Sequence, residues 1–202
     1  MSKFDPQKHH RRSIRLQGYD YSQAGAYYVT IVTQGRECLF GEIIDGEMYL
    51  NEYGEIVQNW WNEILIHFPN VELGAFVIMP NHVHGIIFKT TERRGEVLSP
   101  RDNPNNNIQD GHGVGTDNQG GGTPPLQKPP ILGQIVAYFK YQSTKEMNRI
   151  EIHKAITKFW QRNYYEHIIR DEKDLQNKTD YIEANPSLWD EDDNNPRNDP
   201  LP

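Results

Sequence analysis

The first part of the chain carries the hydrophobic patterns of a strand and a tight hairpin. The stretch AGAYYVTIVTQGR, from Ala24 to Arg36, is rich in aromatic and β-branched residues and ends near a glycine, which is typical of a strand. The next stretch, LFGEIIDGEMYLN, places Asp45-Gly46 between two short apolar runs, a strong signal for a tight turn. We therefore expect a strand followed by a small β-hairpin.

A helical pattern and two further strands come next. In EIVQNWWNEILIHF, from Glu55 to Phe68, apolar residues recur at helical spacing, and Pro69-Asn70 ends the pattern. The predicted stripe consists of Ile56, Trp60, Ile64 and Phe68. VELGAFVIMP predicts a strand, and after a turn at Pro80-Asn81 the run HVHGIIFK predicts another.

The second half begins with a break in composition. Residues from about 90 to 130 contain NPNNN, GHGVG, GGG and TPP with almost no large apolar side chains, so they cannot bury enough surface to offset their ordering entropy. We interpret them as a flexible insertion in a loop, with His112 as a solvated side chain.

Ordered patterns return after the insertion. ILGQIVAYFKYQSTKEMNRI predicts a helix, YYEHIIR alternates like a strand, and DEKDLQNKTDYIEANP predicts a last helix that Pro186 ends. The stripe predicted for the first of these helices consists of Ile131, Ile135, Phe139 and Gln142.

Without the small hairpin, this order is the split β-α-β-β-α-β pattern of an α+β, ferredoxin-like antiparallel sheet, with an added C-terminal helix. The first two helices are expected to cover one face, which leaves the other face or its rim for a site. The predicted organisation is a basic N-terminal arm at 1–20, a single domain at 21–186 interrupted at about 90–130, and an acidic tail at 187–202.

The charge distribution refines this division. The 202 residues carry a net charge of −7, which alone argues against a protein coated in nucleic acid. However, the stretch from Lys3 to Arg15 in the arm contains Lys3, Lys8, Arg11, Arg12 and Arg15 against Asp5, so it can meet phosphates. For the tail, which holds five of the acidic residues, we favour solubilising disorder.

The cysteine content and the hydropathy of the chain indicate its cellular compartment. The single cysteine, Cys38, excludes an internal disulfide. No stretch approaches the run of about 20 apolar residues of a membrane span, and the polar N-terminus lacks the apolar core of a signal peptide. We expect a cytoplasmic protein without a membrane partner.

Two histidines in the predicted strand HVHGIIFK are the first candidates for chemistry. Side chains at i and i+2 of a strand point to the same face, so His82 and His84 project side by side. One strand histidine is more often a hydrogen-bonded structural residue, but a pair on one face after Pro80-Asn81 favours a shared metal ion.

The last helix supplies complementary groups. In DYIEANP, Tyr181 and Asn185 are four residues apart and share a helix face. Tyrosine forms a covalent intermediate when its target is made electrophilic, and the amide oxygen of asparagine suits a hard cation such as Mg²⁺ or Mn²⁺. The combination predicts metal-assisted attack of tyrosine on a phosphate, although Tyr181 alone would be interpreted as a packing aromatic.

Two long motifs resemble the HUH single-tyrosine transposases, most closely the REP-associated tyrosine transposases. They are MPNHVHGIIF, from Met79 to Phe88, which contains the histidine-hydrophobic-histidine motif, and FWQRNYYEHIIRDEKDLQNKTDYIEANP, from Phe159 to Pro186. The resemblance spans most of the chain outside the insertion and the ends. Asn185 stands where insertion-sequence relatives have glutamine, and the REP-associated branch also has asparagine.

This resemblance implies a function. It indicates a metal-dependent single-stranded DNA endonuclease and strand transferase, acting at hairpin repeats through a covalent 5′-phosphotyrosine intermediate. By this resemblance His82, His84 and Asn185 are metal ligands and Tyr181 is the nucleophile. The implied partners are Mg²⁺ or Mn²⁺ and single-stranded DNA with hairpin repeats, in a nucleoid-associated monomer or homodimer.

Several other residues are candidates for DNA contact. Arg11, Arg12, Lys140 and Arg162 are predicted to contact the DNA backbone, although a solvated surface explains Lys140 and the two arm residues equally well. Tyr164 and Tyr165 are predicted to pack or to stack on bases, and Trp160 and His167 to stack on a base or fill the core.

Two functions of other classes remain as alternatives. A non-catalytic nucleic-acid-binding protein on the same fold would bind without Tyr181 or metal, but the Lys/Arg-Gly-aromatic run of RNA-recognition modules is absent from the sequence. A cupin-like metal oxygenase also uses histidine-x-histidine, yet that fold requires many short strands, and this chain predicts three helices.

Overall fold

The structure is a computed structural model, which describes residues 19–21, 23–90, 130–150 and 158–198. The arm at 1–18, with Arg11 and Arg12, and most of the insertion predicted at 90–130 lie outside the described residues. Among the helices described, none is long and apolar enough to cross a membrane.

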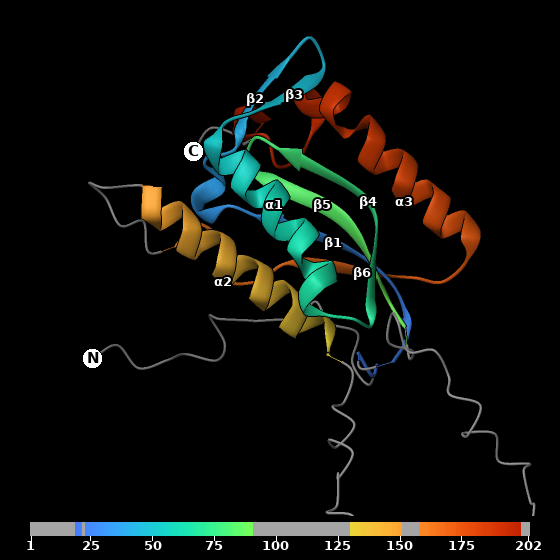
Figure 1. Ribbon diagram of the computed structural model, residues 1–202. Helices are drawn as coiled ribbons and strands as arrows, with labels where there is room; N and C mark the ends of the chain where they lie inside the picture. Colours follow the sequence, from blue (N-terminus) through green and yellow to red (C-terminus); the bar gives the residue numbers. More distant parts are fainter. Residues whose placement is uncertain (1–18, 22, 91–129, 151–157, 199–202) are drawn as a thin grey trace, which may run out of the picture.

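A four-stranded antiparallel sheet forms the centre of the fold (Figure 1). Its strands are β1 (Gly25–Val32), β4 (Val71–Met79), β5 (His82–Lys89) and β6 (Tyr165–Ile169), in the order β4-β5-β1-β6. This order places β5 beside β1, leaves β4 at one edge of the sheet and puts β6 at the other edge. The α+β ferredoxin-like sheet predicted from the sequence is therefore confirmed.

The predicted hairpin is also confirmed. Strands β2 (Gly41–Ile44) and β3 (Glu47–Leu50) pair as a separate two-stranded sheet, which projects beyond the end of the main sheet (Figure 1). Asp45 and Gly46 connect them with φ values of 51° and 81°. Both residues thus have the left-handed backbone that a two-residue turn of type I′ requires.

Helices α1 (Glu52–His67) and α2 (Leu132–Ile150) pack together on one face of the sheet (Figure 1). Asn51 caps α1, because its side-chain oxygen accepts hydrogen bonds from the backbone N–H groups of Tyr53 and Gly54. This cap begins the helix three residues before the predicted start, and the helix ends at His67, one residue before the predicted end.

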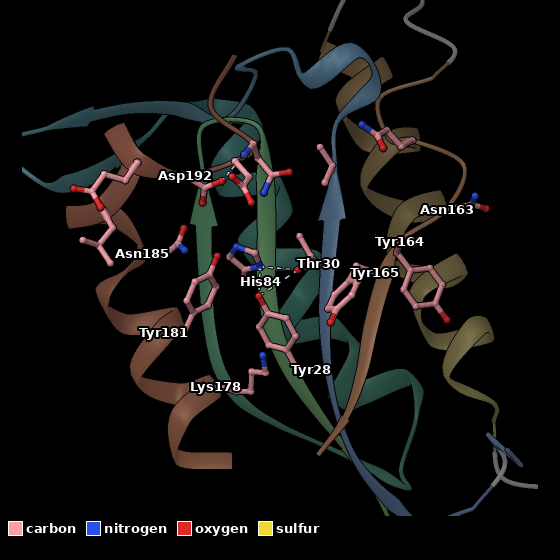
Figure 2. Close-up of a pocket in the computed structure, with 16 residues that line it drawn as sticks. Tyr28, Thr30, His84, Asn163, Tyr164, Tyr165, Lys178, Tyr181, Asn185 and Asp192 are labelled. Carbon is pink, nitrogen blue, oxygen red and sulfur yellow. Dashed lines mark hydrogen bonds between the residues drawn. The ribbon is translucent and has the colours of Figure 1, made fainter. Parts of the chain in front are cut away.

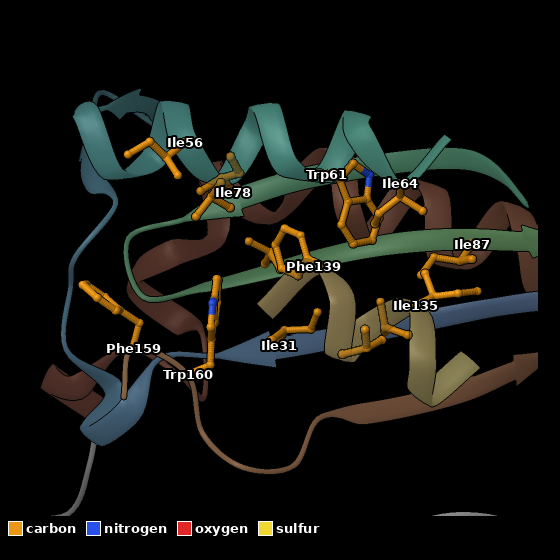
Figure 3. Close-up of a cluster of buried hydrophobic side chains, with 14 of the residues drawn as sticks. Ile31, Ile56, Trp61, Ile64, Ile78, Ile87, Ile135, Phe139, Phe159 and Trp160 are labelled. Carbon is orange, nitrogen blue, oxygen red and sulfur yellow. The ribbon is translucent and has the colours of Figure 1, made fainter. Parts of the chain in front are cut away.

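The core lies between these two helices and the sheet (Figure 3). The Trp61 ring stacks on Phe76 of β4 at 4.3 Å between centroids, and it meets Phe139 of α2 edge-on at 5.5 Å. Gly85 of β5 lies directly beneath Trp61, since a Cβ at this position would be 2.3 Å from the indole. A glycine in the middle of this strand is therefore required by the close approach of the helix.

The exact helical stripes differ from the predicted ones. Trp61, and not its neighbour Trp60, is the buried tryptophan of α1, and Phe68 is only partly buried. On α2 the buried residues are Leu132, Ile135, Val136, Phe139, Ser143 and Met147. Ile131 precedes the helix and is 40% exposed. Adjacent apolar residues make the sequence pattern compatible with either phase, and packing against the sheet selects one.

Helix α3 (Glu172–Ala184) lies on the opposite face of the sheet from α1 and α2 (Figure 1). Its Ile182 packs with Tyr28 of β1 and Ile86 of β5, whereas Tyr27 and Ile87, one residue along each strand, face the main core. Asp171 caps the helix by accepting a hydrogen bond from the Asp174 N–H.

The acidic tail is folded, so the prediction of disorder is wrong for residues up to 198. Asn185 begins a 3₁₀ helix, Asn185–Glu191, and a second, Pro196–Asn198, follows. Asn195 donates from its amide to the Trp189 carbonyl at 2.9 Å, and the Asn194 carbonyl accepts a hydrogen bond from Asn81 Nδ2 at 2.7 Å. These hydrogen bonds hold a segment that has too few apolar residues for its structure to be predicted from hydrophobic periodicity.

Candidate active site

The two histidines of β5 face α3 and are fully enclosed. His82 and His84 are 0% and 2% exposed, and their Nε2 atoms are 2.9 Å apart. A metal–nitrogen bond measures about 2.1 Å, so two nitrogens at right angles around one ion lie about 3 Å apart. The separation of the two imidazoles therefore fits a shared metal ion.

Hydrogen bonds at the opposite ring nitrogens select the tautomer that metal binding needs. Asn81 Nδ2 donates to the carbonyls of Arg36 and Asn194, so Asn81 Oδ1 is the acceptor of the 2.8 Å bond from His82 Nδ1. His82 Nε2 then carries a lone pair directed at His84.

His84 is held in a comparable way. Its Nδ1 lies 2.7 Å from the hydroxyl of Tyr28 and 2.8 Å from that of Thr30 (Figure 2). Both hydroxyl oxygens can accept a bond from Nδ1–H, and in that tautomer the lone pair lies on Nε2.

Burial also keeps both rings neutral. It lowers the pKa of His82 to about 3, and burial together with the neighbouring His82 lowers the pKa of His84 well below its usual value. Neutral imidazole is the form that binds metal ions. Both side chains are thus in the ligating form at neutral pH.

Asp192 from the acidic tail joins the two histidines. Its Oδ2 lies 3.7 Å from His82 Nε2, and the three side chains place one ligand atom each within 4.8 Å of the others. This group can hold a metal ion. Asp192 was not predicted from the sequence, because it lies within the acidic run DEDD and 108 residues beyond His84, with no spacing that distinguishes it from its neighbours.

Asn185, the amide predicted from the resemblance as a ligand, lies at the junction of α3 and the tail and is 2% exposed. Two oxygens here, Asn185 Oδ1 and Asp192 Oδ2, are buried without a hydrogen-bond partner among the described residues. Unpaired buried oxygens are costly unless a cation or water occupies the site. Two imidazole nitrogens and two such oxygens form a donor set that can hold a divalent metal ion, and this mixture of nitrogen and oxygen does not by itself select one metal.

Tyr181 projects from α3 over this group (Figure 2). Its ring centroid is 5.3 Å from that of His84, and the side chain is 43% exposed, so the hydroxyl is accessible from solvent. Burial and the negative charges of Asp192 and Asp193 raise the pKa of Tyr181, while a hydrogen bond with the Asn185 side chain opposes them. The phenol is therefore protonated at neutral pH in the free protein.

A pocket of about 690 Å³ opens above these groups. Its walls come from β1, the segment before β6, α3 and the tail, and they include His84, Tyr181, Asn185 and Asp192 (Figure 2). Tyr164 and Tyr165, predicted to pack or stack on bases, also line it. The pocket thus joins the candidate metal ligands to an aromatic surface.

Two of the residues predicted to contact DNA, Arg162 and Lys140, lie in different surroundings. Arg162 is exposed beside the pocket wall. The Lys140 ammonium donates to the carbonyls of Gln161 and Asn163 at 2.7 and 3.1 Å, and burial lowers its pKa to about 8. Lys140 therefore holds the segment before β6 in place, and a DNA contact by either residue stays a prediction.

Trp160 and His167 have identifiable partners. The Trp160 indole is 7% exposed, packs in the core and donates to Ser143 Oγ at 3.1 Å. His167 of β6 pairs with Asp174 of α3 at 2.8 Å. The first residue is a core side chain, and the second ties α3 to the sheet.

A ferredoxin-like sheet with paired strand histidines and a helix tyrosine defines a class of protein resembling the tyrosine transposases. An uncharacterized protein of Haemophilus influenzae is 39% identical over 191 residues, which covers 95% of this chain and 96% of that protein. This chain belongs to the same family as that protein. No family model matches the chain.

Two further similarities bear on the class. A putative REP-associated tyrosine transposase of H. influenzae is 26% identical over 174 residues, which covers 83% of this chain and 73% of that protein. The structure of a REP-associated tyrosine transposase bound to a REP hairpin has a TM-score of 0.50 at 18% identity, covering 94% of this chain and 74% of the other. The resemblance to REP-associated tyrosine transposases is thereby confirmed, and it supports a transposase-like function.

Proposed function

We propose that this protein is a metal-dependent nuclease and strand transferase that cleaves single-stranded DNA beside hairpin repeats through a covalent 5′-phosphotyrosine at Tyr181. The observation that carries the proposal is the arrangement of this tyrosine, at an open pocket, over two neutral histidine nitrogens and two buried oxygens that have no hydrogen-bond partner among the described residues. A tyrosine beside a hard-cation site is suited to phosphoryl transfer.

The proposed reaction is an in-line displacement at phosphorus. A bond forms between Tyr181 Oη and the scissile phosphorus, and the bond from phosphorus to O3′ breaks. The phosphate remains on the 5′ end of the downstream DNA fragment, where it is now attached to the tyrosine. The upstream fragment leaves with a free 3′-hydroxyl. The phenol loses one proton to solvent and O3′ takes one up, so the step requires no further reactant.

The ligands would be the two histidines, Asn185 and Asp192. A divalent ion held there would act as a Lewis acid on the phosphate. The protein contributes orientation: Asn81, Tyr28 and Thr30 direct the imidazoles, and α3 carries both the nucleophile and the amide.

The substrate class is inferred from the similar transposase that is bound to a REP hairpin. Hairpin-forming repeats with adjacent single-stranded DNA are therefore the substrates we propose. In the structure the histidines and the tyrosine belong to one chain, which supports a site that a monomer can complete.

The test is an adduct assay. Purified protein is mixed with labelled single-stranded oligonucleotides from hairpin repeats near its own gene, with Mn²⁺, Mg²⁺ or EDTA, and separated on a denaturing gel beside Tyr181→Phe. We expect a covalent adduct that requires metal and is absent from the variant.

An adduct that persists in Tyr181→Phe would contradict the assignment of the nucleophile. A retarded complex on a native gel without any adduct would instead indicate a non-catalytic nucleic-acid-binding protein, the alternative on the same fold.

A further inference from the structure

Lys178 lies one helical turn before Tyr181 on α3 and lines the same pocket (Figure 2). Its Nζ atom is 4.9 Å from the centroid of the Tyr28 ring. Tyr28 is itself buried and its hydroxyl lies 2.7 Å from His84 Nδ1. The cation–π contact therefore holds the ammonium over the ring that bonds His84, and its positive charge acts on that imidazole.

The charges around the pocket are otherwise negative. Its walls carry the carboxylates of Glu191, Asp192 and Asp193, and Lys178 is the one lysine or arginine among the described residues that line it. Three carboxylates against a divalent ion leave one negative charge where a DNA phosphate has to bind. Lys178 supplies the missing positive charge.

The ammonium is available for this role. Among the described residues no carboxylate lies within ion-pair distance of Lys178. The charge of Lys178 acts on Asp174, one turn earlier on α3, but the Asp174 carboxylate is bonded to His167 Nε2 at 2.8 Å. A lysine without an ion pair among the described residues, in a pocket lined by three carboxylates, is available to an anionic ligand.

We propose that Lys178 contacts a non-bridging oxygen of the scissile phosphate and neutralises the charge that the phosphate carries during attack by Tyr181. The inference rests on the proposed function. In an in-line displacement the leaving O3′ lies opposite the attacking oxygen, whereas Lys178 lies beside the attacking residue on the same helix face. A group beside the nucleophile meets the non-bridging oxygens and not the leaving group.

The test measures DNA binding in a variant that cannot form the adduct, so the effect of Lys178 on binding is measured separately from catalysis. In a Tyr181→Phe background with Mn²⁺, binding is measured for the oligonucleotide whose cleavage site the adduct assay maps. A second oligonucleotide is identical except for an uncharged methylphosphonate at the scissile position. Lys178→Gln is compared with Lys173→Gln, which removes the same charge from an exposed site of α3 outside the pocket.

We expect Lys178→Gln to weaken binding of the ordinary oligonucleotide by about 10-fold and to leave binding of the methylphosphonate nearly unchanged, because the charge it would meet is absent. Lys173→Gln should affect neither. At saturating DNA in the protein with Tyr181, Lys178→Gln should slow adduct formation by about 10- to 100-fold, and Lys178→Arg should restore most of the rate.

Equal losses on the two oligonucleotides, or no loss, would overturn the role of Lys178 while leaving the nuclease intact. If the parent protein formed no adduct with any hairpin-repeat oligonucleotide, so that no cleavage site could be mapped, both the proposed function and this inference would fall together.

Discussion

The two faces of the sheet are built by the same strands but serve opposite purposes. The face under α1 and α2 is closed and apolar, with Trp61 and Phe139 against Tyr27 and Val29. The face under α3 has a small apolar cluster around Ile182 and then a group of buried polar side chains. The comparison shows that stability is concentrated on one face, and that the other face is free to hold groups whose burial is unfavourable without a ligand.

Strand β5 illustrates how one segment serves both faces. Val83 and Ile87 point into the main core, while His82, His84 and Ile86 point towards α3. Gly85 permits the close approach of Trp61 on the core side. The histidines are thus held by a strand that the core on its other face keeps rigid, which favours a fixed separation of their nitrogens.

The largest expected effect is on the closed face. Trp61→Ala should lower the free energy of unfolding by about 3–5 kcal/mol, because it removes a ring that is 2% exposed and stacked on Phe76. Tyr181→Phe, on the open face, should change it by less than about 0.5 kcal/mol. Urea denaturation of both variants measures the difference.

Ile66→Ala is the matched control for the helix, since Ile66 is 76% exposed on α1. A similar loss for Ile66→Ala and Trp61→Ala would show that the core does not lie on this face.

The next effect concerns the candidate metal ligands on the open face. Asp192→Asn keeps the shape of the side chain and removes its charge, so it should weaken Mn²⁺ binding by about 10- to 100-fold. Calorimetric titration of the DNA-free protein measures this without relying on turnover.

Asp193→Asn removes an equal charge from the adjacent, exposed position, and its effect should be small. If the two variants bound Mn²⁺ equally, the contribution of Asp192 would be general electrostatics and not ligation.

The smallest expected effect is a pH dependence of the stability of the metal-free protein. Since burial lowers the pKa of His82 from 6.5 to about 3, the unfolded chain binds the proton more readily than the folded one. The contribution of His82 to the free energy of unfolding is then fully present above about pH 6.5 and is lost as the pH falls towards 3. At pH 5 the loss from this histidine is about 2 kcal/mol.

Denaturation midpoints in EDTA from pH 7 to 5 test this dependence. His82→Gln, which does not titrate, should show a shallower decline than the parent protein. Parallel declines would mean that the imidazole is not buried in the folded state.

The pairings within the site were accessible from local spacing. His82 and His84 share a strand face, and Tyr181 and Asn185 share a helix face, because β and α periodicities fix the direction of neighbouring side chains. Asp192 was not accessible, because it reaches the histidines through 3₁₀ helices held by polar bonds from Asn81 and Asn195. Hydrophobic periodicity gives no signal for such hydrogen bonds, so the acidic run had the sequence pattern of a disordered segment.

The sequence by itself determined the elements, their order, the hairpin at Asp45-Gly46 and the sheet, because hydrophobic periodicity and turn chemistry act over a few residues. The tertiary structure alone decided which tryptophan of α1 is buried, that α3 lies on the face opposite α1 and α2, and that the tail folds over the histidines. These features depend on contacts between segments distant in the chain, and local patterns do not encode such contacts.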